Sequence, residues 1–276
     1  MTDHYAVFGN PVAHSKSPRI HALFAVQTGE DISYEKIFVP IAGFAAAVSK
    51  FVAEGGRGAN VTVPFKEDAF NIAGHLSPCA QAAGAVNTLT FGNGEIAGDN
   101  TDGAGLVRDL VTNLGVPIKG QRVLLLGAGG AARGAVLPLL LEQPAELVIA
   151  NRTAEKARRL ADAFASLPAC AVSIKHTGCG FGELAGRDYD LVINATSAGL
   201  NNASLDLPAG IFAAGSFAYE MVYGRESPFM TEARRAGASV ADGLGMLVEQ
   251  AAEAFAIWRG IRPETQPVLA QLRSEL

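Results

Sequence analysis

Residues 122–134, RVLLLGAGGAARG, combine an apolar run with a glycine-rich turn and the start of a helical pattern. Gly127, Gly129 and Ala132 fit the spacing G-x-G-x-x-A. In a strand–turn–helix unit, the first glycine permits the tight turn, the second lets backbone approach a pyrophosphate, and the small third residue allows close helix packing. The alternative is a glycine-rich turn without a ligand, which the position between strand and helix disfavours. The stretch therefore predicts a dinucleotide-binding α/β domain.

The end of the next predicted strand indicates which dinucleotide binds. In NAD enzymes an Asp or Glu about 20 residues after the turn holds the ribose 2′-hydroxyl. Here the strand ends in Asn151-Arg152-Thr153, without a carboxylate. Arg152 can pair with a 2′-phosphate, and Lys156 lies one helical turn further along. This favours NADP over NAD, whereas the alternative treats Arg152 as a solvated surface cation.

The rest of the second half continues the alternation of strands and helices. Further strands are predicted at residues 146–151, 171–176, 190–195 and 216–223, and SVADG at 239–243 can add an edge strand. Apolar runs of this kind suit strands covered on both faces. A buried C-terminal helix is predicted from apolar residues at helical spacing: Leu247, Ala251, Ala254 and Trp258.

The first hundred residues predict a separate sheet. Apolar runs at 5–9, 35–40 and 59–64 alternate with helical patterns at 18–28 and 45–53, which implies parallel strands with right-handed crossovers. Residues 85–91 and 95–100 flank Gly-Asn-Gly and predict a hairpin. A helix over 102–114 then leads into the second domain. The expected architecture is α/β, with a mixed-sheet substrate-binding domain (1–102), a Rossmann domain (103–242) and C-terminal helices (243–276) that return to the first domain.

Composition excludes several classes of partner. The chain of 276 residues carries 22 basic and 27 acidic side chains, for a net charge of −5, and has no concentrated basic run. A nucleic-acid-binding protein would show a basic patch to meet phosphates. No stretch approaches the roughly 18 apolar residues of a membrane span. No leader is visible at the N-terminus. We expect a cytoplasmic protein that binds neither nucleic acid nor membrane.

The cysteines and histidines do not suggest a metal site. Cys79, Cys170 and Cys179 cannot all pair and none lies in a Cys-x-x-Cys spacing, so they are interpreted as structural thiols in a reducing compartment. The histidines are separated, and no two have ligand spacing with a carboxylate. No metal is expected.

Polar residues in the first domain gather where predicted strands end. Ser15 and Ser17 open a helix and can present hydroxyls to a carboxylate, although serines in this position are more often simple N-caps. Lys66 follows the third strand, at the sheet edge where open α/β sheets bind ligands. Asp102 follows the hairpin. These residues form a candidate substrate site.

Eight ordered blocks of sequence resemble the shikimate dehydrogenase family. They are FGNPVAHSKSP, GANVTVPFKE, AGAVNTL, GDNTDG, LLGAGGAARG, NRT, INATSAG and ADGLGMLVEQ, and they cover nearly the whole chain. The resemblance implies reversible reduction of 3-dehydroshikimate to shikimate with NADPH, a step of aromatic amino acid biosynthesis. It also implies that Lys66 and Asp102 form the catalytic pair.

The resemblance carries further roles to matching positions. The residues it assigns to the substrate are Ser15, Ser17 and Thr62 for the carboxylate, Lys66, Asn87 and Asp102 for the ring oxygens, and Tyr223 and Gln250 to complete the pocket. The residues it assigns to NADP are Gly127, Ala128, Gly129, Gly130, Ala131, Asn151, Arg152, Thr153, Lys156, Met221 and Gly243, the last two lining the nicotinamide. One departure is Glu220, where many members have Asp.

Two rival functions stay open at this point. A quinate/shikimate dehydrogenase would be similar in fold but broader in substrate. A non-catalytic NADP-sensing module would keep the fold, but it should have lost Lys66 or Asp102, and both are present. The protein is expected to act as a monomer or a homodimer.

Overall fold

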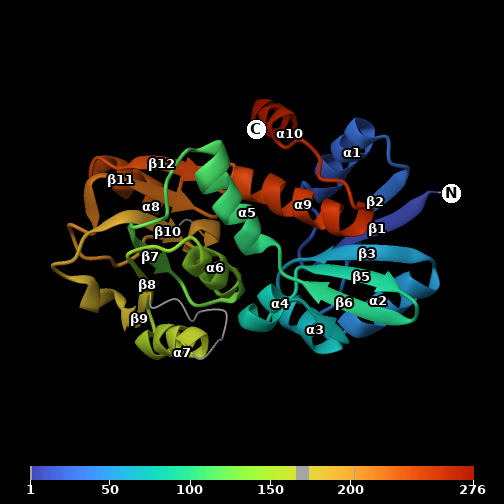
Figure 1. Ribbon diagram of the computed structural model, residues 1–276, viewed down its shortest axis with the longest axis horizontal. Helices are drawn as coiled ribbons and strands as arrows, with labels where there is room; N and C mark the ends of the chain where they lie inside the picture. The colour runs from blue at the N-terminus through green and yellow to red at the C-terminus, as the bar shows by residue number, and fades with distance from the viewer. Residues whose placement is uncertain (1, 166–173, 202) are drawn as a thin grey trace. The chain divides into compact units, whose positions relative to one another are not determined.

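The computed structural model describes residues 2–165, 174–201 and 203–276 (Figure 1). Contacts between Cα atoms divide the chain into two compact units. The first unit contains Met1–Gly105 together with Leu247–Leu276, and the second contains Leu106–Met246. The corresponding boundaries predicted from the sequence lie after residues 102 and 242.

The first unit contains a mixed sheet, as the sequence predicts, but with six strands where the sequence predicts five. Its strands are β1 (Asp3–Gly9), β2 (Ile32–Phe38), β3 (Gly56–Val61), β4 (His75–Leu76), β5 (Thr88–Gly92) and β6 (Glu95–Asp99), in the order β2-β1-β3-β5-β6-β4. β1 pairs in parallel with β2 and β3, whereas β5 is antiparallel to both β3 and β6. The parallel pairing brings the carboxyl ends of β1, β2 and β3 to one edge of the sheet.

Helices cover both faces of this sheet. They are α1 (Ser17–Thr28), α2 (Phe44–Ala53), α3 (Lys66–Ile72), α4 (Pro78–Ala83), most of α9 (Leu244–Arg259) and α10 (Gln266–Ser274). Side chains alternate along β1, since successive residues of a strand point to opposite faces. Phe8 packs edge-on against Phe44 and Phe51 of α2, whereas Tyr5 stacks on Trp258 of α9. Both faces of β1 are therefore buried.

A histidine of α1 lies in an aromatic cluster of the core. The ring of His21 is fully buried and stacks on Tyr34 with 4.3 Å between ring centroids. Phe255 and Trp258 of α9 also lie beside it. Burial disfavours the charged imidazolium and lowers the pKa of His21 to about 3. The histidine is neutral in the folded protein at ordinary pH.

This burial predicts a loss of stability in mild acid. Below a pH of about 6.5 the unfolded chain binds a proton at His21 that the folded protein does not bind, so unfolding becomes more favourable as the pH falls. Between pH 7 and pH 5 this group should cost roughly 2 kcal/mol of stability. The free energy of unfolding is measured in urea at pH 7 and pH 5. Between these pH values, His21→Phe should lose about 2 kcal/mol less stability than the parent protein. His14→Phe is the matched control because it places the same ring at an exposed position, and equal losses in all three proteins would contradict the prediction.

The second unit contains a six-stranded sheet in which all neighbouring strands are parallel. Its strands are β7 (Arg122–Leu126), β8 (Glu146–Asn151), β9 (Lys175–Gly180), β10 (Tyr189–Asn194), β11 (Phe212–Glu220) and β12 (Ser239–Asp242), in the order β12-β11-β10-β7-β8-β9. Counted from β7, this is the Rossmann order 3-2-1-4-5-6. The strand order reverses between β7 and β10, and ligands bind beyond the carboxyl ends of the strands at such a reversal.

The helices of the second unit include a π-helical turn. They are the end of α5 (Asp102–Arg108), the π-helix η1 (Asp109–Asn113), α6 (Gly130–Leu141), α7 (Ala154–Ala165), the 3₁₀ turns η3 (Phe181–Leu184) and η4 (Ser197–Asn201), and α8 (Pro228–Arg235). The helix predicted over 102–114 is thus α5 followed by η1. Within the described part of the chain, no helix is long and apolar enough to cross a bilayer.

Two strands of the second unit differ from their predicted positions. β11 spans Phe212–Glu220, where the sequence predicts 216–223. The other is β9. The sequence predicts a strand at 171–176, of which residues 171–173 lie outside the described residues, and the structure has β9 at Lys175–Gly180. β9 contains glycines because α7 lies directly against it: a Cβ at Gly178 would collide with the backbone of Ala157. The glycines hide the apolar pattern on which the prediction depends.

Cys79 and Cys179 are free thiols, and Cys170 lies outside the described residues.

Candidate functional site

An ion pair lies at the carboxyl edge of the first unit's sheet. Lys66 begins α3 shortly after β3, and Asp102 begins α5 three residues after β6. The Nζ of Lys66 donates a hydrogen bond to Oδ2 of Asp102. The side chains of Lys66 and Asp102 are 19% and 10% exposed, so both are mostly shielded from water yet open to a small ligand. The structure brings the two predicted catalytic residues together across 36 positions of sequence.

Asn87 holds the carboxylate of Asp102 in place. Its Nδ2 donates to Oδ1 of Asp102 over 2.8 Å and lies 3.3 Å from Oε1 of Gln250. Its Oδ1 accepts a hydrogen bond from the backbone N–H of Thr101 over 2.9 Å. Asn87, Asp102 and Gln250 are all buried. Gln250 comes from α9, so the C-terminal segment supplies part of the same polar cluster.

Two serines lie at the start of α1. Oγ of Ser15 donates to Oγ of Ser17 over 3.1 Å and accepts from the backbone N–H of Ser17 over 3.3 Å. The N-cap residue of α1 is Lys16, and its side chain makes no capping hydrogen bond. Neither serine therefore occupies the N-cap position that the alternative interpretation gave it.

Thr62 lies one residue beyond β3, at the same edge of the sheet as Lys66. A Cβ on Gly9 would lie only 2.5 Å from Cγ2 of Thr62, so the glycine at the end of β1 leaves room for this threonine. Thr62 is partly exposed. Its hydroxyl is placed where strand ends of a parallel arrangement meet a ligand.

The glycine-rich turn of the second unit has the shape of a phosphate cradle. Gly127 has φ +115, and a Cβ there would lie 3.0 Å from the carbonyl oxygen of Ala195, so the tight turn requires glycine. By contrast, a Cβ on Gly129 or Gly130 would meet nothing within 4 Å. The fold does not need glycine at these two positions, but a pyrophosphate resting on the backbone does. No side chain caps the N-terminus of α6, which leaves its N–H groups for an anion.

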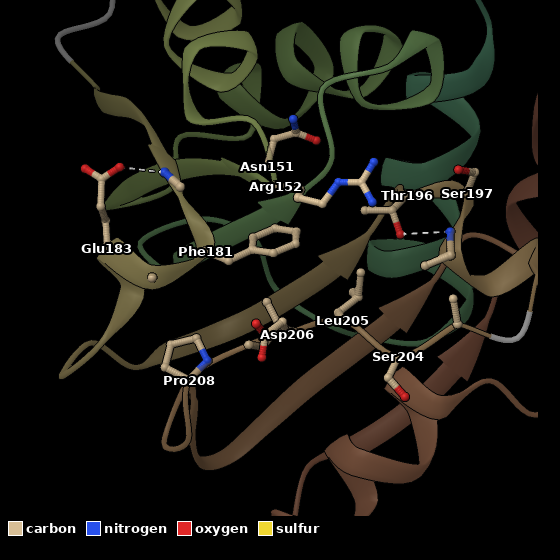
Figure 2. Close-up of a pocket in the computed structure, with 15 residues that line it drawn as sticks. Asn151, Arg152, Phe181, Glu183, Thr196, Ser197, Ser204, Leu205, Asp206 and Pro208 are labelled. Carbon is tan, nitrogen blue, oxygen red and sulfur yellow. Dashed lines mark hydrogen bonds between the residues drawn. The ribbon is translucent and has the colours of Figure 1, made fainter.

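A cavity of about 940 Å³ opens beyond the carboxyl ends of β8, β9 and β10. It is lined by Asn151, Arg152, Gly180, Phe181, Gly182, Glu183, Thr196, Ser197, Ala198, Ala203, Ser204, Leu205, Asp206, Leu207 and Pro208. Figure 2 shows the guanidinium of Arg152 reaching from the end of β8 towards the turn at Thr196 and Ser197. The walls combine apolar side chains and hydroxyl groups with the carboxylates of Glu183 and Asp206. A mixture of apolar surface and a few polar groups is typical of small-molecule sites.

The cations beside this cavity differ in their partners. Arg158 pairs with Glu183, and Arg159 pairs with Glu155. Among the described residues, neither Arg152 nor Lys156 forms an ion pair, and both are exposed. Thr153 is also exposed, and its carbonyl oxygen accepts from Nδ2 of Asn151 over 3.0 Å. Arg152 and Lys156 are thus available to a phosphate group, which fits the absence of a carboxylate at the end of β8.

The other predicted cofactor residues follow β11 and β12. A Cβ on Gly243 would collide with the carbonyl oxygen of Met221, so the turn after β12 lies directly on the segment after β11. Tyr223 is partly buried, and burial raises the pKa of its hydroxyl. Tyr223 belongs to the second unit, whereas the other residues predicted to bind substrate belong to the first.

The sequence analysis noted Glu220 only as a departure from the family and assigned it no role, but the structure shows a buried carboxylate at the same strand ends. Glu220 is fully buried, and its oxygens accept hydrogen bonds from Asn194, Ser227 and Val222 over 2.8, 2.8 and 3.2 Å. Burial raises its pKa. Oδ1 of Asn194 in turn accepts from the backbone N–H and hydroxyl of Thr196. Asn194 lies in the block INATSAG, and a polar residue ending an apolar parallel strand was the available signal.

The parallel sheet, the open glycine turn and the exposed Arg152 define an NADP-dependent oxidoreductase of the Rossmann class. Three family profiles match the chain: "Shikimate dehydrogenase substrate binding domain" over residues 7–89, "Shikimate / quinate 5-dehydrogenase" over 109–201, and "Shikimate 5'-dehydrogenase C-terminal domain" over 243–273. The chain belongs to the shikimate dehydrogenase family. The family and the fold class predicted from the sequence are confirmed.

Relatives and solved structures agree over the full length. Shikimate dehydrogenase (NADP(+)) of Dechloromonas aromatica (strain RCB) is 61% identical over 278 residues, which cover 100% of this chain and 99% of the relative. The protein of the same name from Aromatoleum aromaticum is 57% identical and covers 99% and 98%. The structure of shikimate 5-dehydrogenase from Thermus thermophilus in complex with NADP(H) and shikimate is 34% identical, with a TM-score of 0.87 over 100% of both chains.

Proposed function

We propose that the protein catalyses the reversible reduction of 3-dehydroshikimate to shikimate with NADPH, and that Lys66 and Asp102 are its catalytic residues. The observation that carries this proposal is the Lys66–Asp102 ion pair, held by Asn87 at the carboxyl edge of the first unit's sheet. A mostly buried lysine beside a fixed carboxylate is suited to handling a proton next to a polar substrate. The family relationship supports the choice of substrate.

The proposed chemistry is simple in outline. When bound, NADPH supplies the hydride that the carbonyl carbon of the substrate accepts. Negative charge develops on the carbonyl oxygen, and the ammonium group of Lys66 stabilises that charge and donates the proton. In the reverse direction, Lys66 accepts the proton from the hydroxyl. Asp102 orients Lys66 and accepts a hydrogen bond from a neighbouring hydroxyl of the substrate.

Other side chains of the first unit hold the substrate. The hydroxyls of Ser15, Ser17 and Thr62 bind its carboxylate, and Asn87 and Gln250 bind its ring oxygens. The serines already share one hydrogen bond, so a carboxylate replaces an existing contact and does not need to order two free side chains. These contacts form with substrate and product alike, so they contribute to binding more than to the chemical step. Tyr223 of the second unit completes this set in our proposal.

The second unit binds the cofactor. The backbone from Gly127 to Ala131 and the N-terminus of α6 hold the pyrophosphate. Arg152 and Lys156 pair with the 2′-phosphate, while Asn151 and Thr153 complete the site around the ribose. Met221 and Gly243 line the nicotinamide. The lack of acidic partners for Arg152 and Lys156 within the described part of the chain supports NADP over NAD.

Initial rates of the purified protein test the function. We expect reduction of NADP⁺ with shikimate, little with quinate, and little with NAD⁺ at the same concentration. Comparable turnover of quinate would instead identify a broader quinate/shikimate dehydrogenase. Binding of NADP⁺ without turnover of either acid would support the sensing module. We also propose a cytoplasmic monomer or homodimer; the free thiols of Cys79 and Cys179 fit a reducing compartment, and light scattering distinguishes the two oligomeric states.

A further inference from the structure

A buried carboxylate–tyrosine pair lies inside the second unit, apart from every residue assigned above. Asp109 begins the π-helix η1 and is 2% exposed. Its Oδ2 accepts a hydrogen bond from the hydroxyl of Tyr219 over 2.6 Å, and its Oδ1 accepts from Nδ2 of Asn113 over 2.9 Å. Tyr219 lies in β11 and is fully buried. Burying a carboxylate costs free energy even when it is hydrogen-bonded. We therefore infer that the pair has a role besides filling the core.

The pair holds the β12–α9 turn, by which we mean residues 242–246: the end of β12, Gly243 and the first three residues of α9. The hydroxyl of Tyr219 also accepts a hydrogen bond from the backbone N–H of Met246 over 3.3 Å. A Cβ on Gly245 would collide with the carboxylate of Asp109, so the backbone of the turn lies directly on that carboxylate. The turn is thus fixed from one side by Asp109 and Tyr219, which come from two other elements.

The opposite side of the same turn lies on the segment that follows β11. Gly243 packs on the carbonyl of Met221 without room for a Cβ. Asp242 accepts hydrogen bonds from the backbone N–H groups of Leu244 and Gly224 over 3.3 and 3.1 Å. The turn at residues 242–246 is therefore clamped between the Asp109–Tyr219 pair and the segment 221–224. If the pair is loosened, Gly243 and Met221 lose one of the two supports that set their separation.

We propose that Asp109 and Tyr219 are positioning residues that set where the nicotinamide half of the cofactor lies. This inference rests on the proposed function in one respect, namely the roles of Met221 and Gly243 in the cofactor site. Asp109 and Tyr219 act only through the turn that carries Gly243. The adenosine half depends instead on Arg152 and the cavity at the ends of β8, β9 and β10, so the two halves of the cofactor should respond differently when the pair is changed.

Tyr219→Phe tests this inference because it removes one buried hydroxyl and both of its hydrogen bonds. The dissociation constants of NADPH and of 2′,5′-ADP, which lacks the nicotinamide half, are measured by calorimetry. We expect NADPH to bind about three- to tenfold more weakly, the scale of one hydrogen bond, and 2′,5′-ADP to bind as in the parent protein. With shikimate and NADP⁺, kcat should fall by about tenfold while the KM for shikimate stays nearly unchanged.

Tyr189→Phe is the matched control. Tyr189 is a fully buried tyrosine in β10 of the same sheet, and its hydroxyl has no hydrogen-bond partner among the described residues. The same substitution there should leave all four values as in the parent protein. Equal weakening of NADPH and 2′,5′-ADP in Tyr219→Phe, or no change in either, would overturn the inference. The binding measurements need no substrate. A parent protein that fails to oxidise shikimate would therefore refute the proposed function, whereas the comparison of NADPH with 2′,5′-ADP would still test the inference.

Discussion

Replacing Arg152 with alanine is expected to weaken the binding of NADP⁺ by roughly ten- to a hundredfold, while the binding of NAD⁺ stays nearly the same. A charge-assisted hydrogen bond contributes about 1.5–3 kcal/mol, and each 1.4 kcal/mol is about a factor of ten in affinity. Arg152 is exposed and unpaired among the described residues, so water and salt screen it and the smaller end of this range is expected. NAD⁺ has no 2′-phosphate and loses nothing.

Calorimetric titration with both cofactors, at low and high salt, checks this expectation. The discrimination between NADP⁺ and NAD⁺ should shrink as salt rises, because exposed charges are screened. Arg159→Ala is the control, since Arg159 is a similarly exposed arginine of α7 that pairs with Glu155. Loss of NAD⁺ binding to the same extent would show that Arg152 supports the loop and does not select the cofactor. Efficient use of NAD⁺ by the parent protein would also contradict our interpretation of the end of β8.

Local patterns were sufficient for most of the second unit's fold. The run at β7, the glycine turn and the start of α6 follow from steric rules that act within about ten residues, and the structure has each of them in place. The predicted position of β9 was wrong because the glycines of this strand are required by its close contact with α7. The periodicity of the sequence does not reveal that contact. In the first unit, α3, β4 and α4 were not predicted because these elements have only seven, two and six residues, too few to show a recognisable pattern.

The sites depended on information of a different kind. The glycine turn and Arg152 could be interpreted from their position after a strand. The pairing of Lys66 with Asp102 could not be interpreted in this way. These residues follow two different strands, and the spacing of strands along the sequence does not determine their order in the sheet. The family resemblance carried that pairing. Asp109 and Tyr219 had no signal at all: they are 110 residues apart, and a buried polar pair resembles any other interruption of an apolar run.

Replacing Lys66 with methionine is expected to lower kcat by at least about a hundredfold, with a much smaller change in the KM for shikimate. A positioned acid or base contributes about 10²–10⁴-fold, whereas loss of a contact made equally in the ground state and transition state would mainly raise KM. Methionine keeps most of the stem and removes the charge and the proton. Because Lys66 belongs to the first unit, the affinity for NADP⁺ should be nearly normal, which also verifies that the variant is folded.

Three further variants test the interpretation of this loss of kcat. Lys50→Met is the matched control: Lys50 lies exposed on α2 in the same unit and pairs with Glu54, so kcat should not change. Asp102→Asn should also lower kcat, since it removes the charge that orients Lys66. The double variant of Lys66 and Asp102 should lose less than the product of the two single effects, because the residues act as a unit. Full additivity would mean that the ion pair is not used as a pair.

Lys66→Arg separates proton transfer from charge stabilisation. Arginine retains the positive charge, but its pKa is far too high for easy exchange of a proton. If Lys66 donates the proton, kcat in the arginine variant should stay close to that of the methionine variant. If Lys66 only stabilises the developing charge and water carries the proton, much of the activity should return. Arginine also changes the geometry beside Asp102, so a low kcat alone is ambiguous. Near-normal kcat is the decisive outcome: it would refute proton transfer by Lys66 while leaving its place in the active site intact.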